Sequence, residues 1–175
     1  MYSLLHLFLS MMRNIFILIT FAFSINTVAQ SNIANPQFEA MLDSLLSHTV
    51  AEIYPSELST RDDVIYLDSR AKKEYKVSHI KGARWVGFNS FNMNRVNDIP
   101  KNKKITVYCT VGYRSEKIAE KLIKEGYTDV SNLYGGIFEW VHHNQPIEND
   151  KGSTQEVHAF DKNWGQWLQK GIKIF

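Results

Sequence analysis

One strand that leads straight into a helix, at residues 104–126, constrains the fold of this chain most. The segment KITVYC, which begins at Lys104, is almost continuously apolar, as is typical of a central parallel strand covered on both faces. In the following SEKIAEKLIKEG the apolar residues form one stripe of a helix, with Ser115 as the predicted N-cap and Gly126 as the stop signal. Such a pair is the building unit of α/β folds.

The same alternation recurs elsewhere in the chain. Short strands are predicted at residues 64–67, 83–87 and 130–133, and an amphipathic helix is predicted at residues 36–50. One or two helical turns are expected at residues 71–77. Strands that alternate with helices predict an α/β domain, with a parallel sheet and helices on both of its faces.

Composition limits the class of protein. The chain has 175 residues, of which 44% are hydrophobic and 22% charged, which suits one core-forming domain with terminal extensions. The net charge is +2 and the isoelectric point is about 8.6, without a block of lysines and arginines. We therefore expect no nucleic-acid partner.

The first thirty residues have the order of a secretory signal peptide. Arg13 precedes a mostly apolar run, Ile15 to Phe23, and small residues follow up to Ala29. This run is too short for a bilayer span, which takes roughly 20 residues. We expect residues 1–29 to be a signal peptide, the protein to be exported to a periplasm or secreted, and no stable membrane partner. The alternatives are an uncleaved anchor and a true start later than residues 1–10.

The remaining chain divides into three predicted parts. Residues 30–46 form an N-terminal helical segment, residues 47–148 form the folded domain, and residues 149–175 form a C-terminal tail. We expect the tail to dock on the domain, because two exposed tryptophans, Trp164 and Trp167, would be uncommon. The alternative is a loosely ordered tail.

Cys109 is the only cysteine in the sequence, so it cannot form an internal disulfide. Most lone cysteines are inert core residues, but Cys109 lies at the carboxyl end of the predicted central strand, where open α/β sheets bind ligands. The loop after it offers backbone N–H groups, the conformational freedom of Gly112 and the positive charge of Arg114. These features favour the nucleophilic thiolate, which predicts Cys109 as a catalytic nucleophile.

Four segments resemble motifs of the rhodanese family. CTVGYRS, residues 109–115, resembles the family's active-site loop, C-x-x-G-x-R-[ST]. YLDSR followed by Glu74 and Tyr75, then SHIKGA, then LYGGIFEW resemble three further motifs, in the family's order. Ser78 stands where the family commonly has glycine. The resemblance implies a single rhodanese-like domain, with a five-stranded parallel sheet and helices on both faces.

The resemblance also implies an activity. Cys109 would take a sulfane sulfur from a thiosulfate-like donor and pass it, from a persulfide, to cyanide, a thiol or a protein acceptor. No cofactor is implied beyond that persulfide. Arg114 would bind the anionic end of the donor. We expect Tyr113 to line the entrance and influence the choice of acceptor, and the alternative is that its side chain is simply exposed. The backbone amides that would hold the outer sulfur belong to Thr110, Val111, Gly112, Tyr113 and Ser115.

Other polar residues are predicted to be structural. Asp68 would accept hydrogen bonds from loop N–H groups, and Arg70 would pair with Glu74 four residues later. A single histidine such as His79, without partner ligands, is expected to be a satisfied structural residue. The adjacent His142 and His143 lack the cysteine or acidic cluster that a metal site needs, so no metal is expected.

Two other functions remain open at this point. Phosphatases and arsenate reductases share the fold but resemble C-x5-R, a larger loop that fits a tetrahedral oxyanion. Here four residues separate Cys109 from Arg114, so the smaller loop suits a single sulfur atom. The other alternative is a sulfur carrier without turnover, or a redox or partner-binding module.

Overall fold

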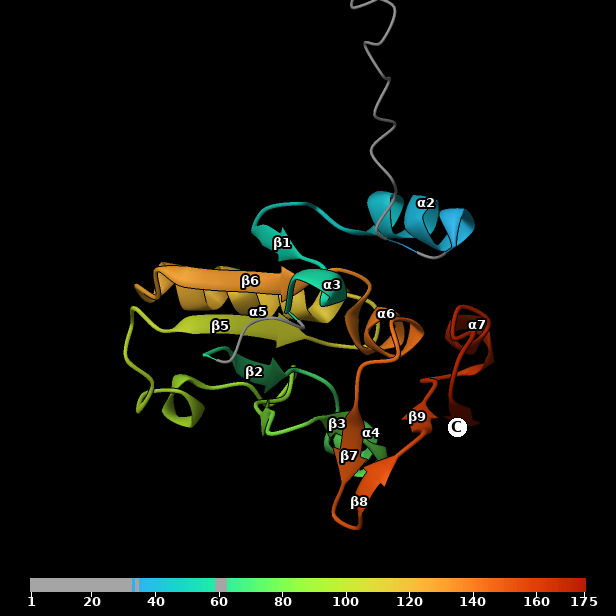
Figure 1. The fold of residues 1–175 in the computed structure, drawn as a ribbon. Helices are drawn as coiled ribbons and strands as arrows, with labels where there is room; N and C mark the ends of the chain where they lie inside the picture. The colour runs from blue at the N-terminus through green and yellow to red at the C-terminus, as the bar shows by residue number, and fades with distance from the viewer. Residues whose placement is uncertain (1–32, 34, 59–62) are drawn as a thin grey trace, which may run out of the picture. The chain divides into compact units, whose positions relative to one another are not determined.

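The computed structural model describes residue 33 and residues 35–58 and 63–175 (Figure 1). The predicted signal peptide lies outside the described residues, so export stays a prediction from the sequence. Within the described ranges, every helix falls short of the length and apolar character that a membrane span requires.

A five-stranded parallel sheet forms the centre of the domain, in the order β1-β6-β5-β2-β4 (Figure 1). This confirms the predicted α/β class with a five-stranded parallel sheet. The strands are β1 (Ala51–Ile53), β2 (Ile65–Asp68), β4 (Arg84–Trp85), β5 (Lys104–Tyr108) and β6 (Asp129–Leu133). The helices are α2 (Pro36–Leu45), α3 (Pro55–Leu58), α4 (Lys72–Val77), α5 (Tyr113–Lys124), α6 (Gly136–His142) and α7 (Lys162–Gly165), with a 3-10 turn η1 (Met93–Arg95).

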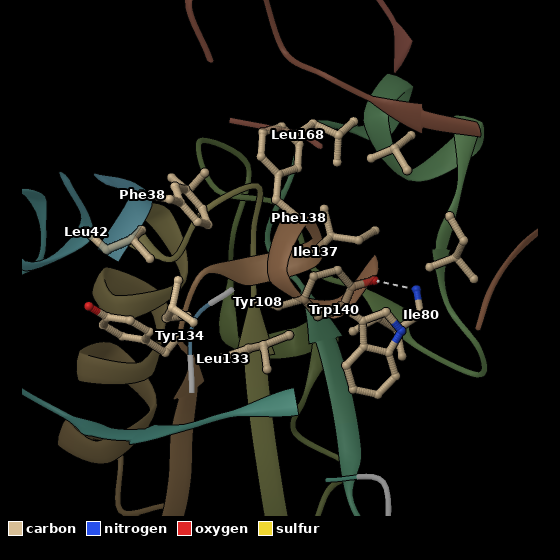
Figure 2. Packing of buried hydrophobic residues seen from close by; sticks show 14 of the residues in the cluster. Phe38, Leu42, Ile80, Tyr108, Leu133, Tyr134, Ile137, Phe138, Trp140 and Leu168 are labelled. Atoms are coloured by element: carbon tan, nitrogen blue, oxygen red, sulfur yellow. Dashed lines mark hydrogen bonds between the residues drawn. The ribbon is translucent and has the colours of Figure 1, made fainter. Parts of the chain in front are cut away.

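The central strand β5 divides the core into two clusters. Ile105 and Val107 belong to the cluster that contains Ile118 and Leu122 of α5. Tyr108 belongs to the other cluster, which contains buried residues of α2, α3 and α6 (Figure 2). Alternate residues of one strand thus pack on helices from opposite sides, as expected for a parallel sheet covered on both faces.

Several short strands were not predicted from the sequence. They are β1 at the edge of the main sheet, the antiparallel group β3 (His79–Ile80), β7 (Ile147–Asn149) and β8 (Gly152–Thr154), and the parallel pair β9 (Glu156–His158) and β10 (Ile172–Ile174). Each has two or three residues, too few for a periodic pattern. The helix predicted at residues 36–50 ends at Leu45, because the chain becomes extended at Leu46 and then enters β1.

The C-terminal segment packs on α2 and α6 (Figure 1). Leu168 is buried, and the ring of Trp167 stacks on that of Phe38 with 5.7 Å between centroids. The backbone N–H of Gln169 donates to Nε2 of His142 at 3.0 Å. The segment therefore completes the core on the α6 side of the sheet.

Tyr108, the last residue of β5, makes a buried polar contact next to the nucleophile loop. Its hydroxyl oxygen accepts from the backbone N–H of Ile80 at 3.1 Å (Figure 2). Tyr108→Phe leaves that buried N–H without its partner, so we expect a loss of about 1–3 kcal/mol in the free energy of unfolding. Urea unfolding measures it. Tyr113→Phe, at a side chain that is 44% exposed, is the matched control and should change stability by less than about 0.5 kcal/mol. Equal effects of the two substitutions would contradict the prediction.

Candidate active site

The nucleophile loop, residues 109–112, joins the end of β5 to α5. Gly112 is the N-cap of α5 and has a left-handed φ of 117°, a conformation that favours glycine. Its backbone N–H donates to Sγ of Cys109 at 3.2 Å. The helix thus begins at Tyr113, and the prediction of Ser115 as the N-cap is wrong, because Gly112 turns the chain into the helix earlier.

Ser115 instead fixes the loop from within the first turn of α5. Its buried hydroxyl donates to Oδ1 of Asn132 at 2.6 Å and lies 2.9 Å from the carbonyl oxygen of Gly112. The amide of Asn132 also donates to that carbonyl, at 3.2 Å. Strand β6 therefore holds the loop in place through one side chain.

Helix α6 holds the loop from the other side. The backbone N–H groups of Ile137 and Phe138 donate to the carbonyl oxygens of Cys109 at 2.9 Å and Thr110 at 3.3 Å. This approach requires Gly136, since a Cβ atom there would come within 2.6 Å of the same carbonyls. Helix α6 therefore binds the carbonyls of Cys109 and Thr110, while the backbone N–H of Gly112 donates to the sulfur.

The surroundings of the Cys109 thiol favour the thiolate. Cys109 is 1% exposed, and burial alone would raise its pKa. The positive charge of Arg114, the hydroxyl and backbone N–H of Ser115 and the backbone N–H of Gly112 outweigh burial, and the pKa of the thiol is lowered. A low pKa marks a cysteine as a nucleophile at neutral pH.

Arg114 reaches from α5 to the start of α4, where it pairs with Glu74. Nη1 and Nη2 donate to the two carboxylate oxygens of Glu74, each at 2.9 Å, and Nη2 also donates to the hydroxyl of Thr110 at 2.8 Å. Glu74 accepts a further bond from the backbone N–H of Ala71 at 2.9 Å. Both terminal nitrogens of Arg114 are therefore bonded within the protein.

The predicted pair between Arg70 and Glu74 is wrong. Arg70 is fully buried and binds Asp68, with 2.7 Å between Nη2 and Oδ2, and it donates to the carbonyl of Ser78 at 2.6 Å. Asp68 also accepts from the backbone N–H of Arg70 at 2.8 Å. Arg70 is therefore paired with Asp68, and the carboxylate of Glu74 pairs with Arg114 instead.

The histidines lie in structural contacts. The ring of His79 stacks on that of Tyr75 with 3.9 Å between centroids, and its Nδ1 lies 3.0 Å from the carbonyl of Tyr75. His142 and His143 both contact the carboxylate of Glu139, at 2.8 and 3.1 Å. Within the described ranges, no group of three histidine, cysteine or acidic side chains is placed to hold a metal ion.

A pocket of about 270 Å³ opens onto Cys109. The predicted residues Thr110, Val111, Tyr113 and Arg114 line one side of it. The other side was not predicted and consists of Leu45, Phe160 and Trp164. The aromatic residues of the tail were a signal that the tail packs on the domain, but no pattern in the sequence indicates that they return to Cys109.

The thiol titration tests the electrostatics of this site. The difference in thiolate ultraviolet absorbance between the wild type and Cys109→Ser isolates the single thiol, and its midpoint should lie below that of an ordinary cysteine. Arg114→Gln removes the positive charge and should raise the midpoint. Arg84→Gln, at a residue paired with the exposed Asp98, is the control and should leave the midpoint unchanged. A wild-type midpoint in Arg114→Gln would contradict this account.

Glu74 gives a second prediction, on acid stability. Burial would raise its pKa, but the hydrogen bonds and charge of Arg114, together with the charge of Arg70, lower the pKa from 4.5 to about 2. The ionised carboxylate therefore stabilises the fold above about pH 4.5, and this contribution is lost as the pH falls towards 2. In Glu74→Gln, the free energy of unfolding should fall less steeply over this range than in the wild type, as measured by urea unfolding. Glu125→Gln, at an exposed residue, is the control and should show the same dependence of the unfolding free energy on pH as the wild type. The same dependence in Glu74→Gln would contradict the prediction.

Comparison with known proteins places this geometry in a family. The family model described as the rhodanese-like domain matches residues 54–143. Two curated relatives are both called tRNA uridine(34) hydroxylase. The one from Acinetobacter baumannii strain AYE is 37% identical over 99 residues, which cover 54% of this chain and 32% of the relative. The one from Bacillus cereus strain Q1 is 38% identical over 86 residues, which cover 46% and 27%. The chain thus spans about a third or less of these relatives.

Solved structures agree on the fold. The BH2092 protein from Bacillus halodurans has a TM-score of 0.54 at 28% identity, with 67% of this chain and 89% of that chain covered. A thiosulfate sulfurtransferase from Pseudomonas aeruginosa has a TM-score of 0.54 at 19% identity, with 78% and 26% covered, which supports the fold alone. The family model spans half of the chain and includes the whole nucleophile loop, so the chain belongs to the rhodanese-like domain family.

Proposed function

We propose that this chain is a sulfurtransferase that carries a sulfane sulfur as a persulfide on Cys109. The observation that carries the proposal is a thiol with a lowered pKa in the lining of a pocket, with the backbone N–H groups of Gly112 and Ser115 as hydrogen-bond donors to the sulfur. A thiolate attacks sulfur readily, and the same N–H groups would stabilise the negative charge of the persulfide. No cofactor enters the reaction.

In the first half-reaction the Cys109 thiolate attacks the outer sulfur of a donor such as thiosulfate. A bond forms between Sγ and that sulfur, the sulfur–sulfur bond of the donor breaks, and the electron pair leaves with sulfite. The negative charge of the persulfide then lies on the outer sulfur. Gly112 N–H and the other N–H groups of the loop would hold that sulfur at the mouth of the pocket.

In the second half-reaction a thiophilic acceptor attacks the outer sulfur. The bond between the two sulfurs breaks, and its electron pair returns to Sγ as the Cys109 thiolate. With cyanide the product is thiocyanate. Two such displacements split the transfer into easier steps, which is the logic of covalent catalysis.

Two observations favour sulfur over a tetrahedral oxyanion as the transferred group. The loop has four residues between Cys109 and Arg114, one fewer than the phosphatase-like pattern. Nη1 and Nη2 of Arg114 each donate to Glu74 and Nη2 also donates to Thr110, so three of the five N–H groups are already used and fewer are left for an oxyanion. For the same reason we revise the role expected of Arg114: it lowers the thiol pKa and braces the loop, and any contact with an anionic donor is secondary.

The activity named for the curated relatives is not proposed for this chain. The match covers 32% and 27% of their lengths, so the hydroxylase activity in their names belongs to proteins that extend well beyond the shared domain.

The test is thiocyanate formation from thiosulfate and cyanide by the purified chain. We expect activity in the wild type and a loss of at least roughly 1000-fold in Cys109→Ser and Cys109→Ala, because each removes the nucleophile. Mass spectrometry after incubation with thiosulfate should find one added sulfur atom on the wild type and none on either variant. A circular dichroism melt checks that both variants are folded.

The outcomes distinguish a sulfurtransferase that turns over from a sulfur carrier that does not. Thiocyanate formation that depends on Cys109 supports the enzyme. An added sulfur without thiocyanate would point to the sulfur carrier that remained open from the sequence. Equal activity of the wild type and the cysteine variants, or neither sulfur uptake nor thiocyanate, would overturn the proposal.

A further inference from the structure

The outer wall of the Cys109 pocket comes from segments on either side of the family-matched domain. Phe160 and Trp164 belong to the C-terminal segment and Leu45 to α2, all outside residues 54–143. The nucleophile loop supplies the inner wall. This chain therefore adds its own surface to a pocket whose chemistry is common to the family, and that surface is entirely apolar.

Phe160 is held over the pocket by its backbone. It has a positive φ of 68°, which is unusual for a residue with a bulky side chain, and its backbone N–H donates to Nδ1 of the buried His158 at 3.0 Å. The preceding residues form β9, which pairs with β10. A strained conformation that is held by the preceding residues points to a role for the side chain that it presents.

The ring of Phe160 lies beside the charged residue of the pocket. Its centroid is 5.3 Å from Cζ of Arg114, and 44% of the side chain remains exposed. Trp164 follows on α7, where the carboxylate of Asp161 caps the helix by accepting from the Trp164 N–H at 2.9 Å. Two aromatic side chains are thus fixed at the mouth of the pocket.

The pocket offers an anionic acceptor little positive charge. Among the described residues that line it, the charged groups are Arg114, whose guanidinium is paired with both oxygens of Glu74, and Cys109, which is negative as the proposed thiolate or persulfide. The ring of Phe160 covers it further. An anionic acceptor would therefore gain little charge attraction in this pocket, whereas an apolar group would remove apolar side chains from water.

The size of the pocket suits a small organic molecule. A volume of about 270 Å³ exceeds the ~150 Å³ apolar cavity that accepts a benzene ring. It leaves room for one aromatic or branched aliphatic group beside a thiol that reaches Cys109. A protein segment would not fit in such a space, although its cysteine side chain could enter it.

We propose that Leu45, Phe160 and Trp164 select, as sulfur acceptor, a small thiol that carries an aromatic or branched aliphatic group. The inference rests on the proposed sulfurtransferase function and names its acceptor class. The acceptor thiolate attacks the outer sulfur of the Cys109 persulfide, so that a new sulfur–sulfur bond forms and the bond to Sγ breaks. The electron pair stays on Sγ as the thiolate, the product is the persulfide of the acceptor, and no oxidant or reductant is consumed.

The test compares acceptors on the full chain after its persulfide is loaded from thiosulfate. The probes are 2-phenylethanethiol, the polar 2-mercaptoethanol and the anionic 3-mercaptopropionate. The rate constant of each thiol with the Cys109 persulfide is divided by the rate constant of the same thiol with a small-molecule persulfide in water. This division removes differences in intrinsic reactivity between the thiols. We expect the corrected ratio of the phenyl thiol to the polar thiol to be roughly ten or more, the discrimination that an apolar pocket commonly gives.

Variants assign the preference to this wall. Phe160→Ala should lower the ratio about ten-fold, and Phe160→Leu, which keeps apolar area, should retain most of it. Ile123→Ala is the matched control, because Ile123 is also 44% exposed but lies on α5 outside the pocket lining, and its ratio should equal that of the wild type. Circular dichroism melts confirm that each variant is folded.

The outcomes distinguish this inference from the function on which it rests. A wild type that loads sulfur and forms thiocyanate, but has a ratio near one, overturns the acceptor class alone. The same holds if Phe160→Ala keeps the wild-type ratio. A preference for 3-mercaptopropionate would also overturn it and would point to the neighbouring cavity of about 720 Å³ that Lys72 and Lys73 line. A wild type that takes up no sulfur and forms no thiocyanate fails the sulfurtransferase proposal itself.

Discussion

The ion pair between Arg114 and Glu74 is the contact on which the site depends. It joins the first turn of α5 to the start of α4, and through them the ends of β5 and β2, so the loop that carries Cys109 is braced across the sheet. The side chain of Glu74 is only 1% exposed, so its carboxylate has lost most of its hydration. Well-placed hydrogen bonds must compensate for that loss. The two parallel bonds and the Thr110 hydroxyl provide that compensation.

The same pair explains how a buried thiol can ionise. Burial disfavours the negative charge on Cys109. The N–H donors of Gly112 and Ser115 and the guanidinium of Arg114 stabilise that charge and outweigh burial. Glu74 limits how positive this region becomes, so the site favours one negative charge on sulfur without becoming a general anion site. Helix α6 contributes indirectly, since its N–H groups occupy the loop carbonyls that would otherwise repel that charge.

The sequence predicts the parts of this molecule that have strong local patterns. The run from Lys104 to Cys109 and the apolar stripe after it predict β5 and α5, and the N-cap of the helix lies at Gly112, three residues before the predicted Ser115. Contacts between distant segments carry no such pattern. Two features depend on tertiary packing and were missed for that reason. Arg70 pairs with Asp68 and not with Glu74, and Phe160 lines the same pocket as Cys109.

The split of the pocket between two walls has an evolutionary consequence. Phe160 lies 51 positions after Cys109, and in the described structure its backbone N–H donates to His158 rather than to the nucleophile loop. A mutation there changes the apolar wall and removes the ring that lies over the Arg114 guanidinium, while the hydrogen bond from Gly112 to the sulfur stays in place. If the chain is the proposed sulfurtransferase, changes in this peripheral segment would alter its range of sulfur acceptors while the residues of the nucleophile loop stay the same.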